Sequence, residues 1–231
     1  MIYDSPLLPE NKPKNIILVC GILLAFIIPI GLSMWMGKVD IAYYDKVLYS
    51  RFFYWGTTLY LLFYALQVER QPLLIIKESK PTLSFFLLSA LVLYLLYIAA
   101  AIVSVFPILF GIHDDKTVIK MISRVLKGHY WFTIFVALTA GVTEEFIFRG
   151  YLLTRLLQVW KNPVMAIVVS SLLFSAMHYK YHSVHELIFA FLIGVIFSVY
   201  YLKYQNIKAI MLVHFLIDII SMELAQHFMV K

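Results

Sequence analysis

The sequence predicts an all-α fold, a polytopic membrane bundle of about seven or eight transmembrane helices. Of the 231 residues, 62% are hydrophobic and only 14% are charged, whereas soluble domains are close to half apolar. The mean hydropathy of the chain is +0.86. Apolar runs of roughly the 20 residues that a helix needs to cross a bilayer recur along most of the chain.

The first half of the chain contains three such runs, at 16–36, 52–68 and 83–110. No convincing cleavage site follows the first run, so we expect it to be retained as a membrane helix rather than removed as a signal peptide. The third run is long enough to tilt or to end in a break near Pro107, because proline interrupts helical hydrogen bonding.

The link at 111–129 has a different pattern, in which apolar and basic residues alternate at helical spacing. The apolar residues are Val118, Met121, Ile122 and Val125, and the basic ones are Lys116, Lys120, Arg124 and Lys127. This pattern is typical of an amphipathic helix that lies on the membrane surface. An ordinary helical loop is the alternative.

The second half contains four more runs, at 130–160, 163–178, 187–203 and 207–229. Pro163 separates the first two, because proline lacks an N–H group and suits the first turn of a helix. The basic residues divide evenly between the two ends of the spans, so their distribution predicts no orientation in the membrane. Since no internal repeat or low-complexity segment is present, residues 1–231 are expected to form a single integral membrane domain.

The basic residues of the chain suit a membrane partner. The formal net charge is +6, and the Lys and Arg residues are scattered through the links between apolar runs. In a nucleic-acid-binding protein they would form a clustered basic stripe. We therefore expect the lipid bilayer, and no nucleic acid, as a partner. Cys20 is the single cysteine, so no disulfide within the chain is available.

Six of the ionisable residues inside the predicted spans of the second half stand out. They are Glu144, Glu145, Arg149, His178, His214 and Asp218. A charged side chain in such a place costs at least ~2.5–3.5 kcal/mol, so these residues usually face the interior of a bundle and mark a function. No comparable cluster is expected elsewhere in the spans.

Helical spacing separates the two adjacent glutamates. Glu145 and Arg149 are four residues apart with the glutamate first, the favoured order for an ion pair within a helix. Glu144 is rotated by about 100° from Glu145, so its carboxylate is free to point elsewhere. The pattern predicts one paired and one unpaired carboxylate. On its own, the pair would equally suit a structural clamp.

Two further pairs have the same spacing, Phe174 with His178 and His214 with Asp218. Three helices can therefore each present polar side chains to a common interior point. Taken singly, His178 would suit the membrane interface, and the pair on the last span would suit hydrogen bonds between helices. The coincidence of three pairs on three spans favours a functional site.

These residues fall within three motifs, EEFIFRG at 144–150, FSAMH at 174–178 and HFLID at 214–218. In this order and spacing the motifs resemble those of the CAAX-protease and bacteriocin-processing (CPBP, Abi) family of intramembrane proteases. The resemblance covers roughly 130–220, which we expect to be the catalytic core. It implies a helical bundle that encloses a hydrophilic chamber in which a peptide bond is hydrolysed.

The resemblance also implies a role for each residue. Glu144 would be the general base that activates water, and His178 would hold or co-activate that water. His214 and Asp218 would bind the oxyanion that develops on the scissile carbonyl. The family often has Asn at the last position, and an ionised Asp218 has no hydrogen to donate, so orienting His214 is the safer role for it. The ion pair of the first motif would fix the helix that carries the base.

The residue types suit this chemistry independently. Amide hydrolysis needs a base that takes a proton from water and a donor that stabilises charge on the carbonyl oxygen, and one Glu with two His supplies both. We therefore expect a CAAX prenyl protease-like intramembrane peptidase that acts on a membrane-associated peptide or protein. The chain lacks the appended domains expected of a large eukaryotic form, which favours a multi-pass protein of a prokaryotic plasma membrane.

Three alternatives stay open at the level of sequence. Glu144, His178 and His214 could hold a catalytic zinc ion with an open coordination position. The segment HYKYHSVHE lacks the Glu of an HExxH motif, however, and we expect no cofactor. The same cavity could bind a membrane peptide or a sensor kinase without cutting it, or it could carry a proton relay in a small transporter.

Overall fold

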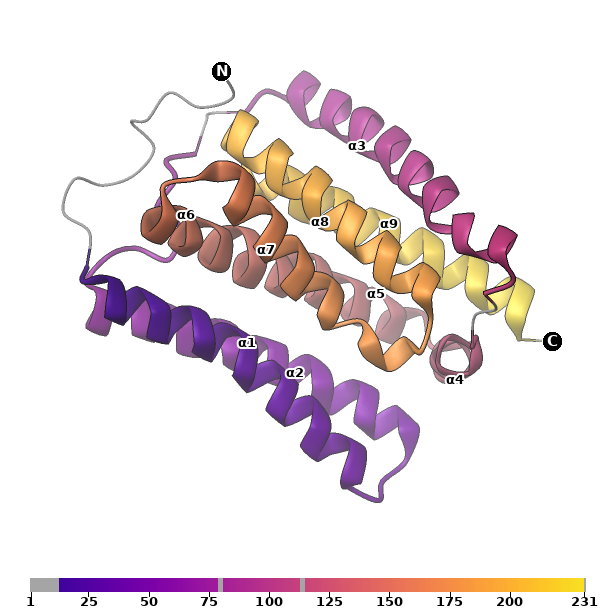
Figure 1. The fold of residues 1–231 in the computed structure, drawn as a ribbon. Helices are drawn as coiled ribbons and strands as arrows, with labels where there is room; N and C mark the ends of the chain where they lie inside the picture. The colour runs from indigo at the N-terminus through magenta and orange to yellow at the C-terminus, as the bar shows by residue number, and fades with distance from the viewer. Residues whose placement is uncertain (1–12, 79–80, 113–114, 231) are drawn as a thin grey trace.

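The computed structural model describes residues 13–78, 81–112 and 115–230, and all regular structure within them is helical. Long helices lie side by side, and successive long helices reverse direction (Figure 1). One short helix, α4 (Thr117–Leu126), lies across one end of the bundle. The predicted all-α class is confirmed.

Each of the three apolar runs of the first half forms a helix. These helices are α1 (Asn15–Lys38), α2 (Tyr43–Phe63) and α3 (Leu83–Ser104). A π-helical segment, Tyr64–Glu69, continues α2, and a 3₁₀ segment, Phe106–Phe110, follows α3. The break predicted near Pro107 is present, because this proline stands in the first turn of the 3₁₀ segment. The helix predicted in the next link is α4.

The fourth run forms one continuous helix whose centre is π-helical. Its parts are α5 (Tyr130–Thr139), the π-helical segments Ala140–Glu144 and Phe146–Leu153, and α6 (Thr154–Trp160). A π-helical turn contains more residues than an α-helical one, and such turns frequently occur at functional sites. The two adjacent glutamates of the first motif, Glu144 and Glu145, lie where these two segments meet.

The last three runs form α7 (Pro163–Ala176), α8 (Val184–Tyr204) and α9 (Ile207–Met229). Each helix begins after a residue whose side-chain oxygen accepts a hydrogen bond from the backbone N–H three positions later. These capping residues are Asn162, Ser183 and Asn206. Short polar links can therefore end one helix and start the next.

Gly141 allows the central helix to approach α9 closely. A Cβ atom at this position would lie 2.8 Å from the backbone nitrogen of Phe215, a distance that real Cβ atoms essentially never show. Because Phe215 follows His214, this contact places the glutamates of the first motif next to the third motif. Gly194 has the same role for α8, where a Cβ atom would lie 2.8 Å from that of Ser171 on α7.

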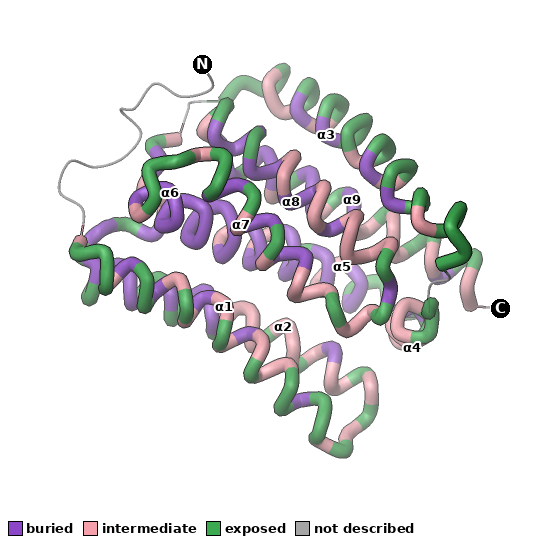
Figure 2. Tube along the Cα trace, viewed as in Figure 1, coloured by how far each residue is buried: buried purple, intermediate pink, exposed green. Residues whose placement is uncertain are grey.

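The helix Tyr130–Trp160 is the most buried of the apolar helices, and outer helices cover it (Figure 2). The outer face of α3 instead exposes large apolar side chains, which suits contact with lipid. Within the described residues, five helices are long and apolar enough to cross a membrane, Asn15–Lys38, Leu83–Phe110, Tyr130–Trp160, Pro163–Tyr181 and Val184–Tyr204. The other two predicted spans form α2 and α9, which are helices outside this set. The protein is an integral membrane protein.

Candidate active site

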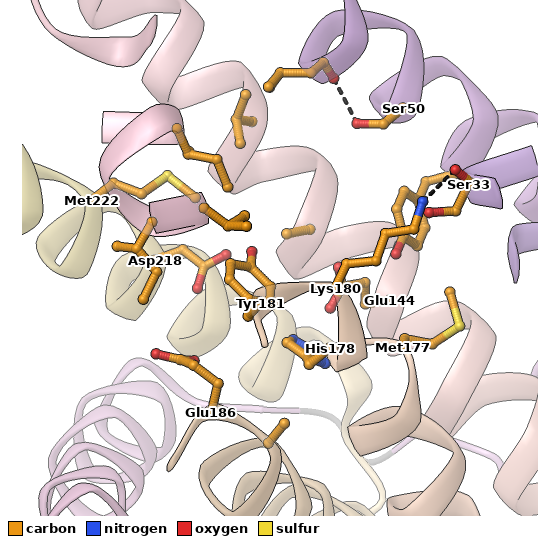
Figure 3. A pocket seen from close by; sticks show the side chains of 18 of the residues that line it. Ser33, Ser50, Glu144, Met177, His178, Lys180, Tyr181, Glu186, Asp218 and Met222 are labelled. Atoms are coloured by element: carbon orange, nitrogen blue, oxygen red, sulfur yellow. Dashed lines mark hydrogen bonds between the residues drawn. The ribbon is translucent and has the colours of Figure 1, made fainter. Parts of the chain in front are cut away.

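The three motifs meet at one cavity of about 900 Å³ inside the bundle. Side chains of α1, α2, α4, α8, α9 and the central helix line it, together with the turn that ends α7. Four of the six predicted site residues are among them, Glu144, His178, His214 and Asp218. Figure 3 shows Glu144, His178 and Asp218 around the interior of the cavity, on the central helix, the turn after α7 and α9 respectively.

Glu145 points away from this cavity and into the protein. Its side chain is fully buried, and its Oε1 atom accepts a hydrogen bond from Arg149 Nη1 at 2.9 Å. The same oxygen lies 2.8 Å from Nδ1 of His214. The salt bridge within the helix agrees with the spacing of the sequence, whereas the contact with His214 was not predicted. Glu145 therefore connects the central helix to α9.

Arg149 packs between two aromatic rings of neighbouring helices. Its guanidinium carbon lies 4.4 Å from the ring centre of Phe174 on α7 and 5.5 Å from that of Phe197 on α8. A cation over an aromatic face is attracted to the ring, and more strongly where water is excluded. Arg149 is 1% exposed, so it connects the central helix to α7 and α8 without reaching the cavity.

The orientation of His178, in the turn after α7, is set by a contact with that helix. Its Nδ1 atom lies 3.0 Å from the carbonyl oxygen of Phe174. A carbonyl oxygen only accepts, so Nδ1 carries the hydrogen, and in the neutral ring Nε2 is left as an acceptor. The ring of Tyr181 stacks on the imidazole at 5.8 Å between centres. The imidazole is therefore fixed in place, with one lone pair available to a donor such as water.

His214 lies between two carboxylates. Its Nδ1 donates to Glu145, because a carboxylate oxygen accepts, and its Nε2 is 3.7 Å from Oδ2 of Asp218. The second distance is too long for a hydrogen bond. Asp218 thus stands beside the ring nitrogen that is not engaged by Glu145.

The cavity also contains polar residues to which the sequence assigned no role. Arg51 and Tyr54 of α2 line it, and so do Tyr181 and Glu186. The guanidinium carbon of Arg51 lies 5.2 Å from the ring centre of Tyr54. Arg51 immediately precedes the apolar run at 52–68, so the run alone gave no sign that α2 begins earlier and carries this cation inward. His182 also lines the cavity.

A second buried polar cluster corrects the expectation that the site residues are alone in the spans. Arg155, in the helix Tyr130–Trp160, donates to Oε2 of Glu69 from Nη2 at 2.7 Å and from Nε at 3.0 Å. Tyr151 donates to Oε1 of the same carboxylate at 2.6 Å. None of the three lines the cavity. Glu69 closes the π-helical segment after α2, just beyond the predicted span, which explains why it was overlooked.

The zinc alternative receives no support from the side-chain geometry. Within the described parts of the chain, no group of three or more His, Cys, Asp or Glu side chains is arranged to hold a metal ion. In particular, Glu144, His178 and His214 line the same cavity but do not form such a set.

Comparison with known proteins supports the resemblance seen in the motifs. Residues 126–220 match the family model described as type II CAAX prenyl endopeptidase Rce1-like. The match contains all three motifs and begins and ends close to the expected core at 130–220. No curated protein and no solved structure matches the chain. The recognition of a CAAX-protease type of membrane protein is confirmed over this segment.

Proposed function

We propose, from the CAAX endopeptidase character of residues 126–220, that the protein is an intramembrane endopeptidase that hydrolyses a peptide bond in a membrane-associated peptide or protein. The observation that carries the proposal is the convergence of the three motifs on one cavity within the bundle. We place the protein in a prokaryotic plasma membrane.

Glu144 acts as the general base in this proposal. It lines the cavity and is 9% exposed, whereas the neighbouring carboxylate of Glu145 is engaged by Arg149 and His214. Glu144 takes a proton from a water molecule as the water oxygen attacks the carbonyl carbon. The proton then passes to the leaving amine nitrogen as the C–N bond breaks. Nε2 of His178, an acceptor in the neutral ring, holds the second hydrogen of that water.

His214 stabilises the oxyanion in its imidazolium form. With Nδ1–H donated to Glu145, a neutral ring has only a lone pair at Nε2, whereas the imidazolium has a second N–H there. That N–H is directed to the oxygen that becomes negative as water attacks. Asp218, 3.7 Å from Nε2, supplies a nearby negative charge that favours the imidazolium. An ionised Asp218 orients His214 and does not itself donate to the oxyanion.

The substitution Glu144→Gln tests the proposal. It keeps the size of the side chain and removes the base, so turnover should fall at least ~100-fold, the lower end of what a general base contributes. The measurement is cleavage of a fluorogenic peptide by detergent-purified protein. Glu223→Gln, on an exposed part of α9, is the matched control and should keep full turnover.

Two outcomes would reject the proposal. Full turnover by Glu144→Gln would remove this residue from the chemistry. Binding of the peptide by the wild-type protein without any cleavage would identify a non-catalytic relative that uses the same cavity. The thermal unfolding curves of both variants should stay close to that of the wild type, so that a lost activity is not a lost fold.

A further inference from the structure

The short helix α4 lies at one end of the bundle of apolar helices. It crosses the end of the bundle between the end of α3 and the start of α5 (Figure 1). Large aromatic side chains flank it on both sides, with Phe110 71%, Tyr130 60% and Trp131 80% exposed. Trp and Tyr are enriched at the depth of the lipid headgroups. This position places α4 at the level of the headgroups.

One face of α4 forms part of the wall of the cavity. The residues on this face are Val118, Ile119, Met121, Ile122, Ser123 and Leu126. Ser123 and Leu126 are buried, and the Ser123 hydroxyl donates to the carbonyl oxygen of Ile119 at 2.8 Å. A displacement of α4 would therefore change the shape of the cavity that contains Glu144.

The opposite face of α4 is basic and exposed. Its four cations are Lys116, Lys120, Arg124 and Lys127. None of them forms an ion pair with any residue that the structure describes. Lys127 donates to the carbonyl oxygen of Val230, and Asp115, the described acidic neighbour, accepts a hydrogen bond from the Thr117 N–H. Cations at this depth attract anionic lipid headgroups.

A glycine in the left-handed conformation precedes α4, and another follows it. Gly111 has a φ of 78° and Gly128 a φ of 81°. Other residues rarely adopt these angles, and a Cβ atom at either glycine would meet open space. The chain can therefore change direction on each side of α4, so that the helix crosses the bundle end and does not continue its neighbours.

We propose that the basic face of α4 binds anionic phospholipid headgroups and that this contact holds its apolar face against the cavity. The ligand is the phosphate of the membrane lipid, recognised by three exposed cations at helical spacing, Lys116, Lys120 and Arg124. The lipid contact itself does not depend on hydrolysis. Its consequence for catalysis, a cavity wall secured by the membrane, rests on the proposed function.

Hydrogen–deuterium exchange of the α4 amides in lipid nanodiscs tests this contact. We expect exchange in Thr117–Leu126 to be at least ~10-fold slower in discs containing phosphatidylglycerol than in discs of phosphatidylcholine alone, since each cation near an anionic surface contributes to binding. The difference should disappear at about 1 M salt, where charges are screened within a few ångströms. Equal exchange in the two lipids would overturn the proposal.

Matched charge removal distinguishes a local contact from an effect of net charge. The triple substitution of Lys116, Lys120 and Arg124 to Gln should abolish the lipid dependence of exchange. Substitution of Lys77, Lys161 and Lys203 to Gln removes the same charge from exposed positions away from α4 and should retain it. The same loss in both variants would contradict a site on α4. Exchange of the α4 amides is also measured on Glu144→Gln, which lacks the proposed base. The lipid contact does not depend on hydrolysis, so this variant should show the same lipid dependence as the wild type.

Discussion

Arg149 illustrates at the scale of one residue how the site depends on a charge outside the cavity. Arg149→Ala leaves Glu145 buried beside His214 without its cation and removes the guanidinium from between two aromatic rings. Breaking a buried pair in this way costs about 3–5 kcal/mol. We expect the free energy of unfolding, measured by SDS titration in mixed micelles, to fall by about that amount. Turnover should fall with it.

Lys203→Ala, at an exposed position of α8, is the control for this measurement. It also removes a cation but leaves no buried partner behind, so the stability of the purified protein should stay within about 0.5 kcal/mol of the wild type. Normal stability of Arg149→Ala with a selective loss of turnover would point to a contact between Arg149 and the substrate.

Metal removal distinguishes a glutamate base from a metal-bound water. If Glu144 acts directly on water, a strong chelator should leave the turnover of the purified protein unchanged, and added Zn²⁺ should not raise it. The measurement is peptide cleavage before and after dialysis against the chelator. Loss of activity that zinc restores would make Glu144, His178 and His214 metal ligands instead.

The spacing of residues along one helix correctly predicted an ion pair beside this site. Contacts between different helices could not be predicted from that spacing. The order Glu145 then Arg149 predicted an ion pair because both lie on one helical face, and the structure contains it. The contact of Glu145 with His214 joins residues 69 positions apart, and no periodicity encodes which helices become neighbours. The resemblance grouped the same residues without revealing this bond.

At the scale of elements, the approach of α9 to the central helix depends on Gly141. In Gly141→Ala, the new Cβ atom would stand 2.8 Å from Phe215 N and 3.0 Å from Met211 O, both backbone atoms of α9. Backbone atoms of a helix cannot change rotamer to relieve the clash, as the end of a flexible side chain can. The whole of α9 must therefore shift, and His214 moves away from Glu145 with it. We expect a loss of about 1–3 kcal/mol in unfolding free energy, as for other overpacked interiors, and a lower turnover.

Gly56→Ala is the matched control, because Gly56 is also within a helix and a Cβ atom there meets nothing within 4 Å. Alanine is the better helix former, so this variant should be as stable as the wild type or more stable by about 0.5–1 kcal/mol. An equal loss in both variants would show that the glycine itself, and not the close approach, matters. Unchanged behaviour of Gly141→Ala would contradict the packing argument.

Element boundaries were predictable where local chemistry determines them. Pro163 and the polar links predicted where helices stop and start, and the capping hydrogen bonds of Asn162 and Asn206 show why. The π-helical segments were not predicted, since the apolar pattern of 130–160 does not distinguish α-helical turns from π-helical turns. The role of Gly141 was equally hidden, because a glycine inside an apolar run gives no sign of what lies opposite.

At the scale of the whole molecule, a buried cluster joins the first half of the chain to the segment that matches the family. Arg155 contacts Glu69 and also donates to the carbonyl oxygens of Pro72 and Leu73. Glu69 and the two carbonyls belong to the chain between α2 and α3, whereas Arg155 belongs to α6. Sequence could not reveal this connection, because its charged partners lie 86 positions apart.

This cluster should therefore control stability without controlling chemistry. Arg155→Met leaves Glu69 buried and unpaired, so we expect the free energy of unfolding to fall by about 3–5 kcal/mol. The double variant Glu69→Gln, Arg155→Met removes both charges and should recover part of that loss, because no uncompensated charge is left. Turnover per folded molecule should stay near the wild-type value in both, since neither residue lines the cavity. A double variant as unstable as the single one would show that the carbonyl contacts of Arg155 matter more than its pair with Glu69. A drop in turnover per folded molecule as large as that of Glu144→Gln would instead mean that the two halves are coupled through the site. In that case the claim that this cluster controls stability without controlling chemistry would be wrong.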